Sequence, residues 1–459
     1  MFNNMFRKKP IGHIHPESSL HRSLTTFDLT LMGIGAIIGA GVFVLTGIAA
    51  ATKAGPAIVI SYIIAGLASM FAALAYAELA ASIGGTGSAY SYAYAGFGEL
   101  IAWIIGWNLL LEYVMSVGTV AIGWSGYVVN FLQAVHIYLP DAITKNPFEG
   151  GVINLIAVLI IITLALLLCL GVKHSARINA VIVAVKLLTI ATFIAVASLN
   201  IQIENWSNFF PFGWTGVMEG AALVFFAYIG FDALSTAVEE AVDPQRSIPI
   251  AIIVSLIVCT IIYIIVSALL TGIVPYTSLN VESPVSDALL KIGHQYMAGI
   301  IAAGAVAGLT TVMLVMFYGL TRICLAMSRD GLIPTSVAKI HSQTHTPIRL
   351  ILITGVVIAA IAGIAPINHA AELVNIGTLA AFTFVCGGVI VLRATLPDLH
   401  RPFKLPFNPL IPFLGIVFCI YLMLNLPAIT WWRFLIWTIA GILIYFLYGI
   451  RHSVLGNVK

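Results

Sequence analysis

Long stretches of hydrophobic residues, separated by short polar segments, make up most of this chain. A stretch of about 20 apolar residues can cross the hydrocarbon core of a bilayer as an α-helix. We therefore expect an all-α membrane protein that crosses the bilayer many times. The pattern predicts twelve transmembrane helices, at residues 27–51, 57–83, 100–132, 152–171, 178–199, 216–238, 248–274, 297–327, 348–367, 372–392, 409–429 and 431–450.

The composition agrees with this interpretation. Of the 459 residues, 60% are hydrophobic and only 8% are charged, whereas a soluble domain has about 25% charged residues. The predicted helices leave no room for a sizeable soluble domain. Residues 1–21 are polar and lack the apolar core and cleavage site of a signal peptide, so we expect no cleaved targeting segment.

The positions of the basic residues predict the orientation in the membrane. With a cytoplasmic amino terminus, only Lys53, Lys145, Lys291 and Arg433 lie on the outer side, and every other Lys or Arg except Lys186 lies on the inner side. The positive-inside rule favours this arrangement, with both termini in the cytoplasm and the protein in the cell membrane. The net charge of +3 then reflects topology and contact with anionic lipid, and it gives no reason to expect a nucleic acid partner.

The first predicted helix contains four glycines between Gly33 and Gly41. Each glycine weakens a helix by about 1 kcal/mol relative to alanine, so we expect the helix to open there. Open backbone within a membrane is tolerated only where protein or a polar cavity satisfies its hydrogen-bonding groups. The segment is therefore a candidate binding site, although Gly35 and Gly39 are also spaced as in a close-packed seam between helices.

A second interruption is expected in the sixth predicted helix, where Gly230 and Asp232 fall within an apolar run. The first and sixth helices cross the membrane in opposite directions under the predicted topology. Two interrupted helices in oppositely oriented halves are typical of inverted-repeat transporters, which bind their substrate near the middle of the membrane.

At these residues the chain resembles the amino acid–polyamine–organocation transporters, and most of all the bacterial relatives of their cationic amino acid transporter branch. The resemblance runs nearly from end to end. It rests on an ordered series of segments, namely Gly33 to Gly41, Tyr76 to Leu79, Gly84 to Tyr90, Phe226 to Asp232, Glu239 to Pro249 and Arg322 to Pro334.

The resemblance implies a leucine-transporter-type core of ten helices and transport by alternating access. Two five-helix repeats would occupy residues 23–199 and 200–393. A cytoplasmic segment, residues 1–22, would precede them, and the two extra helices and the carboxyl terminus, residues 394–459, would follow.

An amino acid zwitterion requires a partner for its carboxylate and another for its ammonium group. N–H groups after the first interruption would bind the carboxylate, and carbonyl groups before both interruptions would bind the ammonium. Phe226 would close over the substrate, unless it is an ordinary lipid or core contact. The predicted substrate-binding residues are Ile34, Gly35, Ala36, Ile37, Ile38, Gly39, Ala40, Gly41, Phe226, Ala227, Tyr228, Ile229 and Met316.

The expected pocket is apolar, which favours neutral L-amino acids. By its family position, Met316 would occupy space that longer cationic side chains need, although it is equally compatible with simple packing. Alanine-like, branched, aromatic or sulfur-containing amino acids, or another small polar metabolite, all remain candidate substrates.

Three ionisable residues within predicted helices are candidates for proton coupling: Lys186, Glu112 and Asp232. Lys186 lies about eight residues, or roughly 12 Å, from the inner end of its helix, and charged side chains at such depth are costly and usually functional. The resemblance suggests that its ammonium group bonds carbonyls of the first helix where sodium-coupled relatives bind a cation. Asp232, like Glu78, has the alternative role of anchoring cytoplasmic loops.

Other functional classes lack their motifs. The dipeptide Gly-Lys of a phosphate-binding loop is absent, as are HExxH and GxSxG, and the cysteines have no metal-site spacing. We expect no enzyme, no cofactor and no metal. The sequence therefore predicts a proton-coupled symporter that imports amino acids and functions as a monomer, with a transporter-like nutrient sensor as the alternative.

Overall fold

The computed structural model describes residues 7–9, 24–83, 87–171, 176–237, 241–341, 344 and 346–457. Parts of two segments that carried the family resemblance, residues 84–86 and 239–240, lie outside this range, as do residues 10–22. Within it, β-structure is limited to one isolated bridge between Leu24 and Ala241.

Helices of the first half are α2 (Thr26–Ile37), η1 (Gly41–Leu45), α3 (Thr46–Ala49), η2 (Ala50–Ala54), η3 (Gly55–Ala57), α4 (Ile58–Ile83), α5 (Ala89–Gly96), α6 (Glu99–Ala134), α7 (Asp141–Thr144), η4 (Pro147–Glu149), α8 (Leu155–Cys169), α9 (Ala176–Ser198) and η5 (Ile203–Trp206). Helices of the second half are α10 (Gly213–Val224), η6 (Phe225–Tyr228), η7 (Phe231–Ala237), α11 (Pro244–Ile273), η8 (Tyr276–Ser278), α12 (Pro284–Lys291), α13 (Gln295–Arg329), α14 (Ile348–Ile364), α15 (Ile367–Thr395), α16 (Leu410–Leu424), α17 (Ala428–Ile444), η9 (Tyr445–Gly449), α18 (Ile450–His452) and α19 (Val454–Asn457).

Among the described residues, eight helical segments are long and apolar enough to cross a membrane. The first, Thr26–Ile83, covers two of the predicted helices. Three shorter apolar helices, α8, α14 and α16, coincide with further predicted spans. The chain is thus an all-helical, multi-pass membrane protein, as the hydrophobic pattern predicted.

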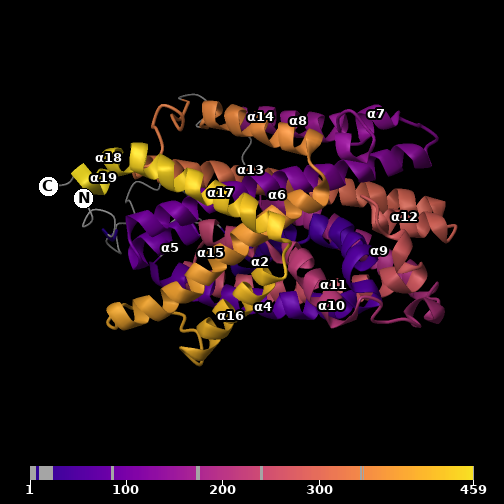
Figure 1. The fold of residues 1–459 in the computed structure, drawn as a ribbon, viewed down its shortest axis with the longest axis horizontal. Helices are drawn as coiled ribbons and strands as arrows, with labels where there is room; N and C mark the ends of the chain where they lie inside the picture. Colours follow the sequence, from indigo (N-terminus) through magenta and orange to yellow (C-terminus); the bar gives the residue numbers. More distant parts are fainter. Residues whose placement is uncertain are drawn as a thin grey trace.

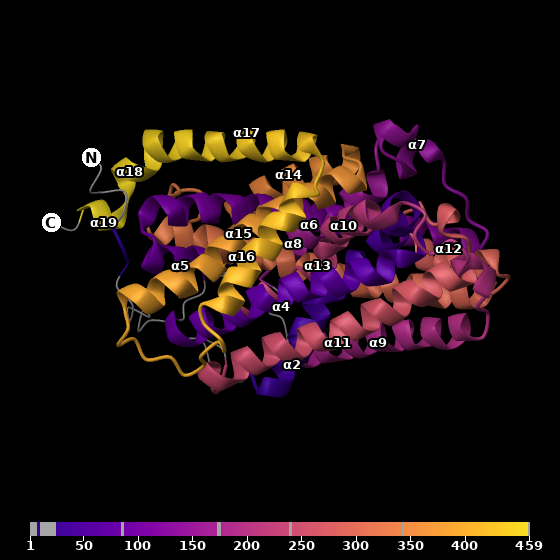
Figure 2. The ribbon, with the colours of Figure 1, turned by 60° about the horizontal axis from the view of Figure 1, so that its bottom comes forward.

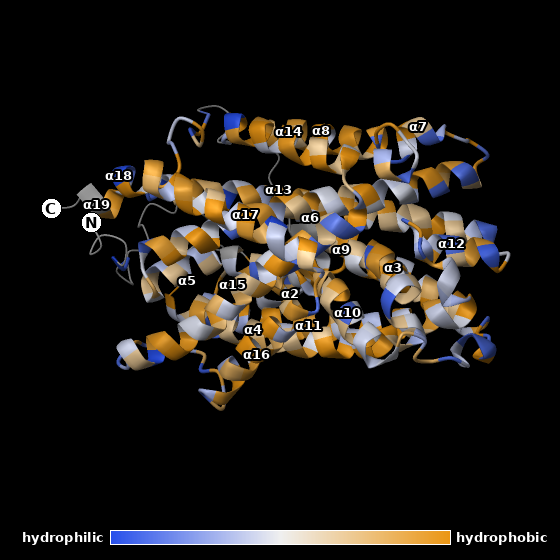
Figure 3. Ribbon diagram, in the orientation of Figure 1, coloured by the Kyte–Doolittle hydropathy of each residue, from blue (hydrophilic) through white to orange (hydrophobic). Residues whose placement is uncertain are grey.

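The helices run side by side along the long axis of the molecule (Figure 1). Figure 3 shows that hydrophilic residues gather toward the two ends of the bundle, whereas its flanks are mostly hydrophobic. The two ends of the described chain lie at one end of the bundle, since Arg7 Nη1 donates a hydrogen bond to Leu455 O at 2.7 Å. This distribution is the one that a bilayer around the middle of the bundle requires.

Burial separates a central group of helices from an outer one. Most of the segment from α10 to η7 is buried within the protein, whereas only about a fifth of the segment that contains α17 is buried. Large apolar side chains exposed on α17 recur at helical spacing, at Trp432, Ile436, Ile439 and Leu443, and Figure 2 shows α17 along the outside of the bundle. In a membrane this face meets lipid, so its exposure costs nothing.

The centre of the bundle is built from α2, α6, η6, η7 and α13. Helix α6 packs along α13, and α11 packs against both α2 and α4. These contacts hold the two segments with expected interruptions at the middle of the protein, where the candidate site lies.

Candidate functional site

The first helix changes conformation where its glycines are concentrated. Helix α2 ends at Ile37, and Ile38 adopts an extended conformation with φ −71° and ψ 100°. Helical structure then resumes, with the π-helical turn η1 beginning at Gly41. Because the first N–H groups of a helical segment have no partner inside it, this junction can present backbone donors to a ligand.

A second change of conformation follows α10. The 3₁₀ turn η6 ends at Tyr228, Ile229 is extended with φ −65° and ψ 138°, and Gly230 has φ +121°. A Cβ atom at Gly230 would lie 2.8 Å from the carbonyl oxygen of Ala36. Both the positive φ and the close approach therefore require glycine at this position.

We call the segment around Ile38 the first junction and the segment around Ile229 the second junction. The two junctions are in contact. A Cβ atom on Gly41 would lie 2.2 Å from Cα of Ala227, and only glycine allows this approach. The hydroxyl group of Tyr263 lies 2.9 Å from Ile37 O and 2.8 Å from Ala227 O, so its one proton is shared between the two carbonyls. Tyr263 on α11 thus links the end of α2 to η6.

Other polar side chains satisfy the backbone around the junctions. The amide nitrogen of Asn375 donates to Ala222 O at 2.8 Å and Leu223 O at 2.9 Å, where α10 gives way to η6. Tyr62 donates to Gly41 O at 3.1 Å. Backbone groups that lack a helical partner inside a membrane must form hydrogen bonds within the protein, and these side chains provide them.

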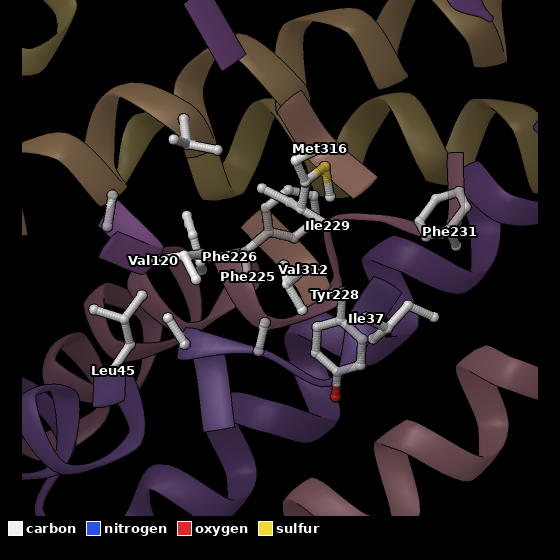
Figure 4. Packing of buried hydrophobic residues seen from close by; sticks show 14 of the residues in the cluster. Ile37, Leu45, Val120, Phe225, Phe226, Tyr228, Ile229, Phe231, Val312 and Met316 are labelled. Atoms are coloured by element: carbon white, nitrogen blue, oxygen red, sulfur yellow. The ribbon is translucent and has the colours of Figure 1, made fainter. Parts of the chain in front are cut away.

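A small cavity lies between the junctions, α6 and α13. Figure 4 shows Ile37, Val120, Phe226, Ile229, Val312 and Met316 in this region. The volume open to the centre of a water molecule is about 10 Å³. This is roughly the minimum that one water molecule needs. A larger ligand therefore enters only when the walls separate. The lining residues are Ala36, Ile37, Gly39, Ala40, Gly41, Ser116, Val120, Phe226, Ile229, Val312 and Met316.

Most of the predicted binding residues line this cavity, and five lie beside it: Ile34, Gly35, Ile38, Ala227 and Tyr228. Four of these five residues have contacts on other sides. The carbonyls of Gly35 and Ile38 face Lys186, and Ala227 packs against Gly41. Tyr228 turns away, and its hydroxyl donates to Tyr62 O at 2.7 Å.

Lys186 on α9 is fully buried. Its ammonium nitrogen donates to Gly35 O at 2.6 Å and to Ile38 O at 3.1 Å, so the contact with first-helix carbonyls that the sequence suggested is present. Gly308 on α13 leaves room for the side chain, because a Cβ atom there would lie 2.8 Å from Lys186 Cγ. Lys186 thereby joins α9 to α2 and lies against α13.

Glu112 and Asp232 form a buried acidic pair near the cavity. Tyr113 donates to Asp232 Oδ2 at 3.1 Å, and the two carboxyl groups are close enough to interact electrostatically. Within the described part of the chain, no basic side chain forms an ion pair with either carboxyl. Two buried carboxyl groups that interact in this way repel each other when both are charged. Glu112 lies one helical turn from Ser116, which lines the cavity.

Glu78 has the anchoring role that the sequence offered as its alternative. Its carboxylate is buried and accepts from Arg393 Nε at 2.8 Å and from the Leu405 N–H at 2.8 Å. The contacts tie α4 to the end of α15 and to the segment after it, and none of these residues lines the cavity.

Sequence reasoning missed several residues of this site: Tyr62, Ser116, Val120, Tyr263, Val312 and Asn375. Asn375 could have been found, because an amide inside an apolar helix needs a partner. Serine and valine are ordinary in membrane helices, so nothing in the sequence distinguishes Ser116, Val120 or Val312.

An all-helical multi-pass protein with a small, mainly apolar cavity where two helices change conformation has the construction of a membrane transporter. The comparison with known families makes this specific. The family model described as amino acid permease matches residues 24–446, and the chain belongs to this family, within the amino acid–polyamine–organocation superfamily.

The relatives support this assignment over the whole chain. The branched-chain amino acid permease BcaP of Bacillus subtilis is 49% identical over 100% of both chains. The methylthioribose transporter of the same organism is 48% identical, covering 99% of this chain and 100% of the relative. Human cationic amino acid transporter 4 is 32% identical, covering 97% of this chain and 90% of its own.

Proposed function

We propose that this protein imports neutral L-amino acids together with protons by alternating access. The observation that carries the proposal is the cavity at the contact between the two backbone junctions. We further propose twelve membrane crossings, arranged as five-helix repeats at 23–199 and 200–393 with two added helices. The protein would lie in the cell membrane as a functional monomer, with both termini in the cytoplasm.

Backbone groups at the junctions would bind the zwitterion. The residues from Gly39 to Gly41 line the cavity and lie where a helical segment starts. N–H groups at the start of a helix suit a carboxylate. The carbonyl of Gly35 already accepts from Lys186, and those of Ile37 and Ala227 accept from Tyr263. The carbonyl of Ala36, at the cavity, is our candidate for the ammonium group.

The cavity wall favours neutral side chains. No charged side chain is among the described residues that line it, and a buried cationic substrate would therefore lack the partner that its charge requires. The high identity to BcaP agrees with this choice, whereas the cationic amino acid transporter is a more distant relative.

Proton coupling would use Lys186 and the pair of Glu112 and Asp232. Lys186 bonds the same junction that borders the cavity, so a change in its charge would alter the backbone that holds the substrate. Glu112 on α6 lies one helical turn before Ser116, and Asp232 lies on η7. The pair would hold one proton, because two negative charges there would repel. Transport would then need no sodium.

A second candidate substrate is methylthioribose, because the transporter named for it is as similar to this chain as BcaP. A transporter-like sensor is the other alternative. Uptake measurements distinguish both alternatives from the main proposal. A sensor would bind its ligand without accumulating it, and a methylthioribose transporter would accumulate that sugar but no amino acid.

Uptake into proteoliposomes tests the proposal. Radiolabelled amino acids and methylthioribose are presented with and without an inward proton gradient, in sodium-free buffer. We expect neutral amino acids to accumulate only with the gradient, and arginine and methylthioribose not to accumulate. Accumulation of methylthioribose alone, or binding without any accumulation, would contradict the proposal.

A further inference from the structure

The cavity contains one hydroxyl group, that of Ser116 on α6. Among the described lining residues it is the only side chain with an O–H or N–H donor. Ser116 is 2% exposed, and its Oγ forms no hydrogen bond with any described part of the protein. A buried hydroxyl without a partner costs free energy, so this one calls for an explanation.

The hydroxyl group of a serine or threonine in a helix usually donates a hydrogen bond to a backbone carbonyl of the preceding turn. Thr119 on the same helix does so, donating to Met115 O at 2.8 Å, and Ser125 donates to Ile122 O at 2.8 Å. Ser116 does not. Its donor therefore has no partner in the described protein, and it belongs to a residue that lines the cavity.

The surroundings of Ser116 indicate which part of a substrate it meets. Val120 follows it by one turn on α6, and both line the cavity together with Val312 and Met316, one turn apart on α13. This wall is apolar apart from the hydroxyl. The backbone donors and acceptors for a zwitterion lie at the junctions instead, so the wall on α6 and α13 faces the substrate side chain.

We propose that Ser116 is a specificity-determining residue, whose hydroxyl donates a hydrogen bond to an oxygen or sulfur atom on the substrate's side chain. The inference rests on the proposed function and narrows it. The preferred substrates are neutral amino acids with a short side chain that carries one such acceptor, in preference to hydrocarbon side chains of the same shape.

Isosteric pairs of amino acids test this directly. Threonine is compared with valine, and methionine with norleucine, in competition for uptake by the wild type, Ser116→Ala and Ser116→Cys. We expect the wild type to prefer the acceptor-bearing member of at least one pair about five- to tenfold, the usual range for one hydrogen bond. Ser116→Ala should abolish that preference, and Ser116→Cys, with its weaker donor, should reduce it.

Ser69→Ala is the matched control. Ser69 on α4 is also buried with an unpartnered hydroxyl, but it does not line the cavity, so its replacement should leave the preference unchanged. If Ser116→Ala keeps the wild-type preference, the inference about Ser116 is wrong but the proposed function stands. The same holds if Ser116→Ala loses affinity equally for both members of each pair. Absence of amino acid uptake by the wild type would instead overturn the proposed function and the inference with it.

Discussion

At the residue scale, the cavity is shaped by side chains that carry no charge. Met316 reaches the second junction, where its Cε would lie 3.1 Å from a Cβ on Gly230. Its flexible thioether side chain fills a gap that a longer substrate would need. Under the proposed function, selectivity for short neutral substrates would therefore depend on the volume of the cavity as much as on its polarity.

Replacing Met316 with serine tests this volume argument. Met316→Ser should admit longer side chains and give measurable uptake of arginine, at a stability cost of roughly 2–4 kcal/mol from the new cavity. Met313→Ser is the control, because Met313 is equally buried on α13 but does not line the cavity. An unchanged substrate profile of Met316→Ser would show that this methionine only fills space.

Some residues of the site could be predicted from the sequence and others could not. Lys186 stood out because a charge deep in an apolar helix is rare, and its hydrogen bonds to Gly35 and Ile38 followed the expected arrangement. Ser116 could not be singled out, because its significance depends on where the face of α6 points. Tyr263 was hidden for the same reason, since aromatic residues are common in membrane helices.

At the scale of elements, the contact between the two junctions depends on glycine. The glycine-rich run from Gly33 to Gly41 includes the point where α2 ends, at Ile37. That the second junction would press against the first could not be foreseen, because a contact between Gly41 and Ala227 is set by the packing of α11 and α4 around them. Long-range packing of this kind leaves no local signal.

Gly41→Ala should separate the two junctions. A Cβ atom 2.2 Å from the Ala227 backbone cannot be accommodated without movement, so we expect uptake to fall at least about tenfold, a loss of about 1.4 kcal/mol or more in binding. Gly299→Ala on α13 is the control, since the added Cβ would make an ordinary contact at 3.8 Å. Uptake assays on both variants decide the point, and wild-type uptake by Gly41→Ala would rule out a tight junction.

At the scale of the whole molecule, contacts among residues that do not line the cavity join segments far apart in the sequence. Glu78 binds Arg393 and the backbone of Leu405, and Lys9 pairs with Asp330 at 2.8 Å. In the proposed orientation these contacts lie at the cytoplasmic end of the bundle. Under alternating access, contacts here must loosen each time the substrate is released inward.

Arg393→Gln should destabilise the protein, because it removes the closer of the two arginines that pair with the buried carboxylate of Glu78 and leaves only Arg401, whose Nε lies 3.6 Å away. We expect a loss of about 3 kcal/mol in unfolding free energy, measured by thermal unfolding in detergent. Lys145→Gln should change stability by less than about 0.5 kcal/mol, since its pair with Asp141 is exposed. Equal stability of the two variants would mean that Glu78 does not anchor this end.

We propose above that amino acid transport is coupled to protons through Lys186. The most direct measurement follows amino acid uptake and internal pH together in sodium-free proteoliposomes, for the wild type and Lys186→Met. The account predicts that protons enter the wild-type vesicles with the amino acid, and that Lys186→Met loses gradient-driven accumulation. Equal accumulation by both proteins under the same gradient would contradict it.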